Sequence, residues 1–323
     1  MVLFPHLIGN PRAKWQLTKI LSGSLPHLLV FSGPKGVCKA EFAREFAVQL
    51  IGEKERHRIE SGSHPDCYML RPEGKASIHP ISAIHELLDR ASRPAYSSDL
   101  KIFIIEEAHL MPASSSNALL KLLEEPKGRV YFILTSSEVG KMLPTIISRS
   151  QQIHFHAIDP SEIEKTLLTE GVEAVKAKKC AFLSLGSLKK ARLAATKTQE
   201  KMDELLYSLM RHHHFSDALF LQQSLSELDT LLAAKEDESV LDKMDPILEK
   251  ILLWQRDCYL LKMGLNESEI FHQDEIPALK AASTYPMLSL KRVIARISEA
   301  RRALAHNVAP GQVLEHLFLR LSV

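Results

Sequence analysis

Closely spaced cysteines are absent from this chain of 323 residues. Its four cysteines are scattered and form no Cys-x-x-Cys pair: Cys38, Cys67, Cys180 and Cys258. This spacing favours neither a disulfide framework nor a zinc knuckle, so we expect free thiols in a reducing cytoplasm. The adjacent histidines 212–214 predict no metal site either, because three consecutive residues on a helix point in three directions.

Long apolar runs are also missing. No run approaches the roughly 20 residues that span a bilayer, and residues 1–6 show neither a basic segment nor a cleavage pattern. We therefore expect neither a membrane helix nor a signal peptide. Forty-one basic against 39 acidic residues leave a net charge of +2, which argues against a nucleic-acid coat protein but allows a local basic face.

The first half of the chain alternates short apolar runs with helical patterns. The apolar runs predict buried strands at 27–32, 101–105, 130–135 and 152–155. The helical patterns cover 39–50 and 117–125, and Pro126 ends the second. Near-continuous apolar strands alternating with helices predict an α/β domain over residues 1–158, whose parallel sheet has helices on both faces.

After about residue 158 the strand patterns vanish. Asp159-Pro160-Ser161 is a helix-start signal, and short helices are predicted at 161–169, 175–185 and 189–195. Longer amphipathic helices follow at 201–211, 215–234, 241–263, 287–306 and 310–322. Polar turns are expected at 235–238 and 266–275. We predict a small helical domain over 159–200 and an all-α domain over 201–323.

A phosphate-loop pattern follows the first strand. Gly33-Pro34-Lys35-Gly36-Val37-Cys38-Lys39-Ala40 resembles G-x-x-x-x-G-K-[ST], in which backbone N–H groups wrap phosphates, the lysine neutralises them and the hydroxyl binds Mg²⁺. Gly33 and Lys39 match, and Gly36 lies inside the loop. Cys38 replaces the second glycine, and Ala40 removes the hydroxyl ligand. We expect a degenerate site that either binds ATP or ADP without catalysis or binds no nucleotide.

Two acids end the second apolar strand. Glu106 and Glu107 resemble the pair in which the first acid holds Mg²⁺ and the second polarises the attacking water. Glutamate at position 106, where aspartate is usual, carries its carboxylate about 1.5 Å farther out, roughly one carbon–carbon bond. The alternative is two solvated acids that merely end a strand.

Three further motifs resemble the AAA+ domain of bacterial DNA polymerase III clamp-loader subunits. They are Asn117-Ala118-Leu119-Leu120-Lys121-Leu122-Leu123-Glu124-Glu125-Pro126, Ser61-Gly62-Ser63-His64-Pro65-Asp66, and Pro144-Thr145-Ile146-Ile147-Ser148-Arg149-Ser150. Residues 7–10 and 302–321 also resemble this family. The resemblance implies an AAA+ P-loop domain, a helical lid domain and an all-α collar that holds subunits together.

The resemblance also implies roles for single residues. Arg149 matches the arginine finger that reaches the ATP site of a neighbouring subunit, and a guanidinium suits γ-phosphate oxygens. Ser137 (or Ser136) occupies the sensor 1 region, and Lys189 matches the sensor 2 position weakly. Arg149 and Lys189 are otherwise ordinary surface cations. Glu107 matches the catalytic acid, which is vestigial if no ATP is hydrolysed.

The departures from the family pattern are informative. Residues 51–63 contain no cysteine, so the family's zinc module is expected to be lost, and His85 replaces a usual arginine. A damaged phosphate loop beside an intact Ser-Arg motif resembles the delta-prime branch, which hydrolyses little ATP. The resemblance implies a five-subunit ring with gamma/tau-like and delta-like partners, a sliding clamp and primer–template DNA. A gamma/tau-like ATPase, a stand-alone P-loop ATPase and a purely structural scaffold remain alternatives.

Overall fold

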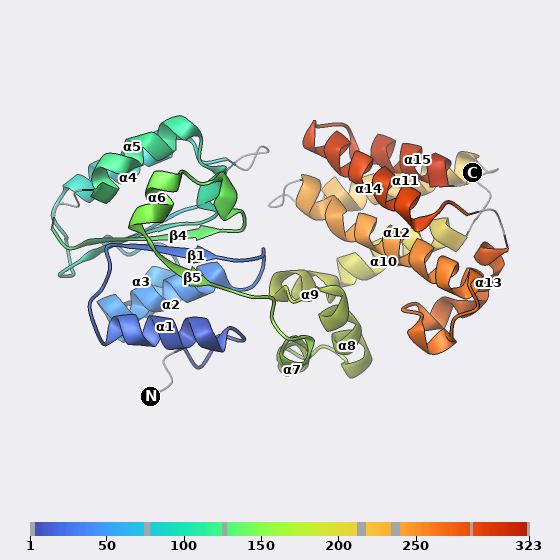
Figure 1. Ribbon diagram of the computed structural model, residues 1–323, viewed down its shortest axis with the longest axis horizontal. Helices are drawn as coiled ribbons and strands as arrows, with labels where there is room; N and C mark the ends of the chain where they lie inside the picture. The colour runs from blue at the N-terminus through green and yellow to red at the C-terminus, as the bar shows by residue number, and fades with distance from the viewer. Residues whose placement is uncertain are drawn as a thin grey trace. The chain divides into compact units, whose positions relative to one another are not determined.

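Five short strands form a parallel sheet in the first part of the chain (Figure 1). The computed structural model describes residues 4–73, 78–124, 128–211, 218–233, 240–284 and 287–321. The strands are β1 (Leu28–Ser32), β2 (Cys67–Leu70), β3 (Lys101–Ile105), β4 (Val130–Ser136) and β5 (Gln151–His154). Their order is β2-β3-β4-β1-β5, and every neighbouring pair is parallel. The predicted parallel sheet is confirmed, with an additional edge strand, β2.

Alternate residues of the central strands face opposite sides of the sheet. On β1, Leu29 and Phe31 join one apolar cluster, whereas Leu28 and Val30 join another. Every residue of β1 and β3 is buried. Burial on both faces explains why these strands appear in the sequence as continuous apolar runs rather than as alternating patterns.

Helices cover both faces of this sheet (Figure 1). On one side lie α1 (Pro11–Leu21), α2 (Lys39–Ile51) and α3 (Arg56–Glu60), and on the other α4 (Ile81–Ser92), α5 (Ala113–Glu124) and α6 (Pro144–Arg149). Helix α5 begins four residues before its predicted start, and its predicted end at 125–126 lies outside the described residues.

Three short helices follow β5: α7 (Pro160–Thr169), α8 (Ala174–Leu183) and α9 (Leu188–Ala194). The predicted start of α7 is confirmed, because the Asp159 carboxylate accepts a hydrogen bond from the Ser161 N–H at 2.8 Å. Ile163, Leu167 and Leu188 belong to the same apolar cluster as Phe31. The chain divides by compactness into residues 1–195 and 196–323, so a separate domain over 159–200 stays a prediction.

The second unit is built from helices alone among its described residues. They are α10 (Lys197–Arg211), α11 (Ala218–Ala233), α12 (Val240–Lys262), α13 (Ile276–Ser283), α14 (Leu290–Ala305) and α15 (Pro310–Leu321). Trp254 is the largest fully buried side chain of their core. Helix α13 had no predicted counterpart, while 266–275 contains two short 3-10 turns. Residues 212–214 and 235–238 lie outside the described residues.

Candidate functional site

The phosphate-loop segment links β1 to α2 and is closely packed. A Cβ on Gly33, whose φ is +150°, would lie 2.2 Å from the carbonyl oxygen of Phe155. A Cβ on Gly36, whose φ is +77°, would lie 2.0 Å from Oγ of Ser187, just before α9. Both positions favour glycine, because side chains avoid such backbone angles and an added Cβ would overlap the Phe155 backbone at Gly33 and the Ser187 side chain at Gly36.

Lys39, the first residue of α2, turns its ammonium group inward. Its side chain is only 4% exposed, and Nζ donates hydrogen bonds to the carbonyl oxygens of Gly33 at 2.8 Å and Pro34 at 2.7 Å. The Glu107 carboxylate lies 3.6 Å from Nζ. Burial lowers the pKa of Lys39, and Glu107 partly opposes this shift. An ammonium group has three donors, so three partners within the protein satisfy it.

Cys38 has a backbone conformation that glycine adopts more easily than other residues do. Its φ of +68° and ψ of +22° are left-handed, a conformation that costs most residues other than glycine about 1 kcal/mol. Its side chain is buried in the core, and burial raises the pKa of the thiol to about 12. Cys38 is therefore a packing residue rather than a reactive thiol.

Glu107 lies directly after β3, also with a left-handed backbone, at φ +48°. Its Oε2 accepts hydrogen bonds from Oγ of Ser137 at 2.7 Å and from the Ser137 N–H at 3.1 Å. Nδ1 of His109 lies 3.4 Å from the same oxygen. Ser137, rather than the fully buried Ser136, thus contacts the acid predicted to be catalytic.

Glu106 is paired with two arginines that the motifs did not indicate. Its Oε1 accepts hydrogen bonds from Nη2 of Arg44 at 2.8 Å and from Nε of Arg71 at 3.2 Å. Arg44 lies one turn beyond Ala40 on α2, and helical side chains lean toward the helix N-terminus. Its guanidinium therefore extends toward Ala40, the position at which the phosphate-loop pattern requires a hydroxyl. The spacing of four from Ala40 is the one sequence signal that could have found Arg44.

The described side chains of this cluster pair with one another, and nucleotide binding stays a prediction. Glu106 already has two guanidinium partners, Ala40 offers no metal ligand, and Lys39 is held by two carbonyls and Glu107. A phosphate group would have to displace Lys39 from these partners. The site is a set of mutually neutralised charges at the carboxyl ends of β1, β3 and β4.

Lys189 and Arg149, the remaining two predicted site residues, differ in their position relative to the phosphate loop. Lys189, in the first turn of α9, has its backbone N–H 3.5 Å from the Gly36 carbonyl oxygen, and its side chain is exposed. Arg149 is exposed at the end of α6, on the opposite side of the sheet from α2, where Nη1 donates to the Thr145 carbonyl at 3.2 Å. The fold thus brings Lys189 to the loop and leaves Arg149 apart.

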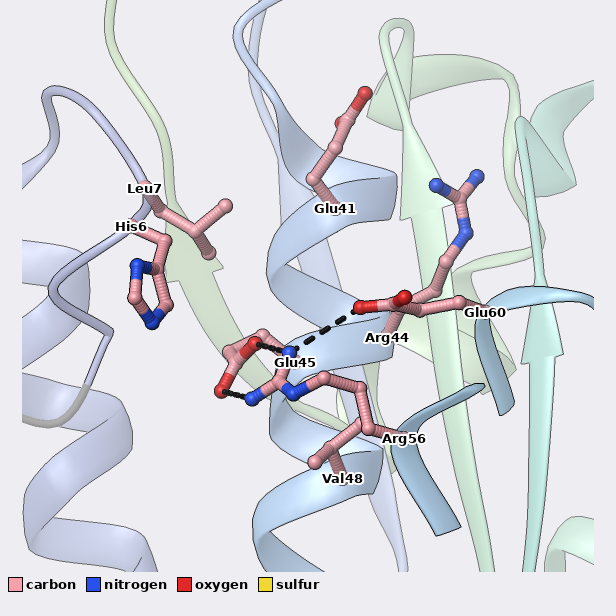
Figure 2. A pocket seen from close by; sticks show the side chains of 8 residues that line it. All are labelled: His6, Leu7, Glu41, Arg44, Glu45, Val48, Arg56 and Glu60. Carbon is pink, nitrogen blue, oxygen red and sulfur yellow. Dashed lines mark hydrogen bonds and ion pairs between the residues drawn. The ribbon is translucent and has the colours of Figure 1, made fainter. Parts of the chain in front are cut away.

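Arg56 pairs with several carboxylates in and near residues 51–63, the segment from which the family's zinc module is expected to be missing. Figure 2 shows its guanidinium between the carboxylates of Glu45, at 2.6 Å, and Glu60, at 3.2 Å, beside a cavity of about 430 Å³. The hydrogen bonds that Arg56 donates to Glu45 and Glu53 raise the pKa of Arg56. Among the described residues no cluster of three His, Cys, Asp or Glu side chains could hold a metal ion. The loss of zinc stays a prediction.

The aspartate of the Ser-Gly-x-His-Pro-Asp motif has a structural role. Asp66 is 2% exposed and accepts hydrogen bonds from the N–H groups of Tyr96 and Ser97 at 2.7 Å and of Ser98 at 2.9 Å. Burial alone would raise its pKa, but these bonds outweigh burial and lower it to about 2. Asp66 therefore fixes the loop that leads into β3.

Comparison with known proteins shows which proteins this chain is similar to. The family model described as "DNA polymerase III, delta subunit" matches residues 9–159. The delta-prime subunit of Bacillus subtilis DNA polymerase III is 29% identical over 321 residues, covering 92% of this chain and 91% of that protein. A Pseudomonas aeruginosa delta-prime subunit is 32% identical over 137 residues, covering 39% of this chain and 42% of that one.

The likeness to gamma/tau subunits is shorter. The gamma/tau subunit of Mycobacterium bovis is 32% identical over 175 residues, which is 51% of this chain and 30% of that protein. The match to the Bacillus subtilis delta-prime subunit, in contrast, runs through both units of this chain. The chain is therefore similar to bacterial DNA polymerase III clamp-loader subunits, and its similarity to a delta-prime subunit runs along nearly its whole length.

Proposed function

We propose that this chain is a clamp-loader subunit that supplies Arg149 to the ATP site of a neighbouring subunit and hydrolyses little or no ATP itself. In this role it joins gamma/tau-like and delta-like subunits in a five-membered ring. ATP binding by the neighbours orders the ring, which opens the sliding clamp and grips primer–template DNA through phosphate contacts. The whole chain then acts as a fixed partner whose contribution to catalysis is made in trans.

The observation that carries this proposal is the contrast between the two arginine environments. Arg44 is turned inward and neutralises Glu106, whereas Arg149 is exposed at the end of α6. A guanidinium that stabilises charge on a neighbour's γ-phosphate must reach beyond its own subunit. Lys39 and Glu107 would act on a nucleotide bound by this chain. Here they form an ion pair with each other, and Glu107 also accepts a hydrogen bond from Ser137.

The test is the ATPase rate of a reconstituted complex containing Arg149→Ala. Because trans-acting arginines contribute about 10³–10⁵ in rate, we expect a loss of orders of magnitude at the site that Arg149 completes, with assembly unchanged by size exclusion. Arg129→Ala, another exposed arginine of the first unit, is the control and should leave the rate unchanged. An unaltered ATPase in a correctly assembled Arg149→Ala complex would refute the role.

A gamma/tau-like subunit with its own ATPase is the second candidate, favoured by the half-chain likeness to gamma/tau proteins and by the presence of Lys39 and Glu107. Steady-state ATP hydrolysis by the purified chain separates the two. Mg²⁺-dependent hydrolysis that disappears in Lys39→Ala supports the gamma/tau-like role. If the purified chain hydrolyses no ATP, the role proposed here is supported.

A further inference from the structure

The outer face of α1 carries an exposed indole between two cations. Arg12, Trp15 and Lys19 recur at helical spacing, and Trp15 is 64% exposed. Nζ of Lys19 lies 5.4 Å from the centroid of the Trp15 ring. The opposite face of α1 is buried in the apolar core. We call Arg12, Trp15 and Lys19 the α1 face.

The segment that contains this face carries charge of one sign, although Glu162 of α7 lies near enough to act on Lys14. The first 40 residues contain five basic residues and no Asp or Glu, and three of the basic residues lie in α1. Lys14 is engaged by the Leu7 carbonyl. Arg12 and Lys19 form no ion pair with any part of the chain that the structure describes. The α1 face thus presents cations without internal counter-ions.

We propose that the α1 face binds single-stranded nucleic acid, with a base stacked on Trp15 and phosphates contacted by Arg12 and Lys19. The two cations are seven residues apart, which is about 10 Å along a helix axis. They can therefore contact the backbone on either side of one stacked base. Sequence-tolerant binding of single strands combines such cations with aromatic stacking surfaces, because every base has a π-face.

Other partners fit this face less well. An anchor residue for a protein partner usually lies in a well-packed patch whose surrounding contacts exclude water, and a membrane-binding helix needs several apolar side chains. The exposed residues of α1 are Pro11, Arg12, Trp15 and Lys19, with no exposed Leu, Ile, Val or Met. A lone planar ring flanked by cations matches a planar, polyanionic partner.

The chain contains its own reporter for the test. Of its two tryptophans, Trp15 is exposed and Trp254 is 1% exposed, so a stacked base should quench only Trp15. The full chain is titrated with oligo(dT) of about 16 nucleotides, the upper site size of single-strand binding modules, at low salt. We expect quenching in the wild type and none in Trp15→Phe, although Trp15→Phe should keep most of the affinity measured by anisotropy of labelled oligo(dT).

Three further variants separate stacking from charge. Trp15→Ala should weaken binding roughly 5- to 150-fold, the fold-change that corresponds to losing one base–aromatic stack. Arg12→Glu/Lys19→Glu should weaken binding and reduce the slope of log affinity against log salt by about 1.4, for two lost phosphate contacts. Lys291→Glu/Arg292→Glu changes the charge equally on the exposed part of α14 and should preserve the affinity.

Clear results would overturn the proposal. One is oligo(dT) binding that leaves Trp15 fluorescence and the Trp15→Ala affinity unchanged. Another is equal loss in the α14 control, which would indicate attraction by net charge alone. Equal binding of duplex DNA or of polyglutamate would assign the face to shape or to acidic protein segments. Because the assay uses the isolated chain, its result is independent of Arg149.

Discussion

At the scale of single residues, the charged side chains of the candidate nucleotide site are paired with other groups of the protein. Lys39 donates to two loop carbonyls, and Glu106 accepts from Arg44 and Arg71. These pairs occupy the groups that would otherwise hold phosphate and Mg²⁺. Cys38 and Ala40 lack the glycine and the hydroxyl of the phosphate-loop pattern, and Lys39 and Glu106 have partners within the protein. Partly buried charges without ligands require such partners.

Glu106→Gln should destabilise the chain. The substitution leaves the guanidinium of Arg44, 22% exposed and with a buried Nε that has no hydrogen-bond partner among the described residues, beside a neutral amide. We expect a loss of about 1–2 kcal/mol in the free energy of unfolding, between the values for exposed and buried pairs. Urea denaturation followed by circular dichroism measures it.

Glu86→Gln is the matched control, because Glu86 pairs with Arg90 on the exposed side of α4. It should change stability by at most about 0.5 kcal/mol. Added Mg²⁺ should leave the urea midpoint of the wild type unchanged. If a Mg²⁺ site existed, Mg²⁺ at about 100 times its Kd would add about 2.7 kcal/mol to the free energy of unfolding. A Mg²⁺-induced stabilisation that Glu106→Gln abolishes would show that a metal competes with the arginines.

At the scale of elements, the phosphate loop is packed against the start of α9. The absent Cβ of Gly36 would overlap Oγ of Ser187, and the Lys189 N–H approaches the Gly36 carbonyl. Gly186 is also confined, since its Cβ would lie 2.5 Å from that of Ala157. Helix α9 therefore covers the loop through contacts that leave no space for another atom at these points.

Gly36→Ala tests this contact. The substitution adds left-handed strain of about 1–2 kcal/mol and an overlap with Ser187 that costs typically about 1–3 kcal/mol more. Gly62→Ala is the control, because Gly62 has a φ of +71° against +77° for Gly36 but nothing within 4 Å of its Cβ position. We expect Gly36→Ala to lose more unfolding free energy than Gly62→Ala in urea. Equal losses would mean that the loop and α9 separate easily.

At the scale of the whole molecule, the two units each enclose their own apolar core. Two clusters on either side of the sheet stabilise residues 1–195, and a third cluster around Trp254 stabilises residues 196–323. Each unit is long enough to bury a core of its own. The cores belong to separate units, so folding of one should not require the other.

We therefore expect the fragments 1–195 and 196–323 to fold when expressed separately. The far-UV circular dichroism of the two should sum to that of the whole chain. Trp254 in the second fragment should keep the blue-shifted emission of a buried indole, while Trp15 in the first should emit as an exposed one. An unfolded fragment, or red-shifted Trp254 emission, would show that the units depend on each other.

Much of the fold was predictable, because periodicity reports burial directly. The strands β1, β3, β4 and β5 lie within one residue of their predicted bounds, and the main helices follow their apolar periods. Strand β2 was missed because it has four residues, of which only the two at its ends are buried. Helix α13 was missed because it is short, carries Pro277 in its first turn and follows a polar segment.

The departures from the phosphate-loop pattern were determined by the sequence alone. Ala40 has no side-chain oxygen in any fold, and Cys38 always adds a side chain where the pattern needs glycine. The replacement partners were decided only by tertiary structure. Arg44 and Glu106 are 62 positions apart and meet because α2 follows β1 while β3 ends at the same edge of the sheet. Residue identity sets which interactions a group can make, but strand order sets which groups are near enough to make them.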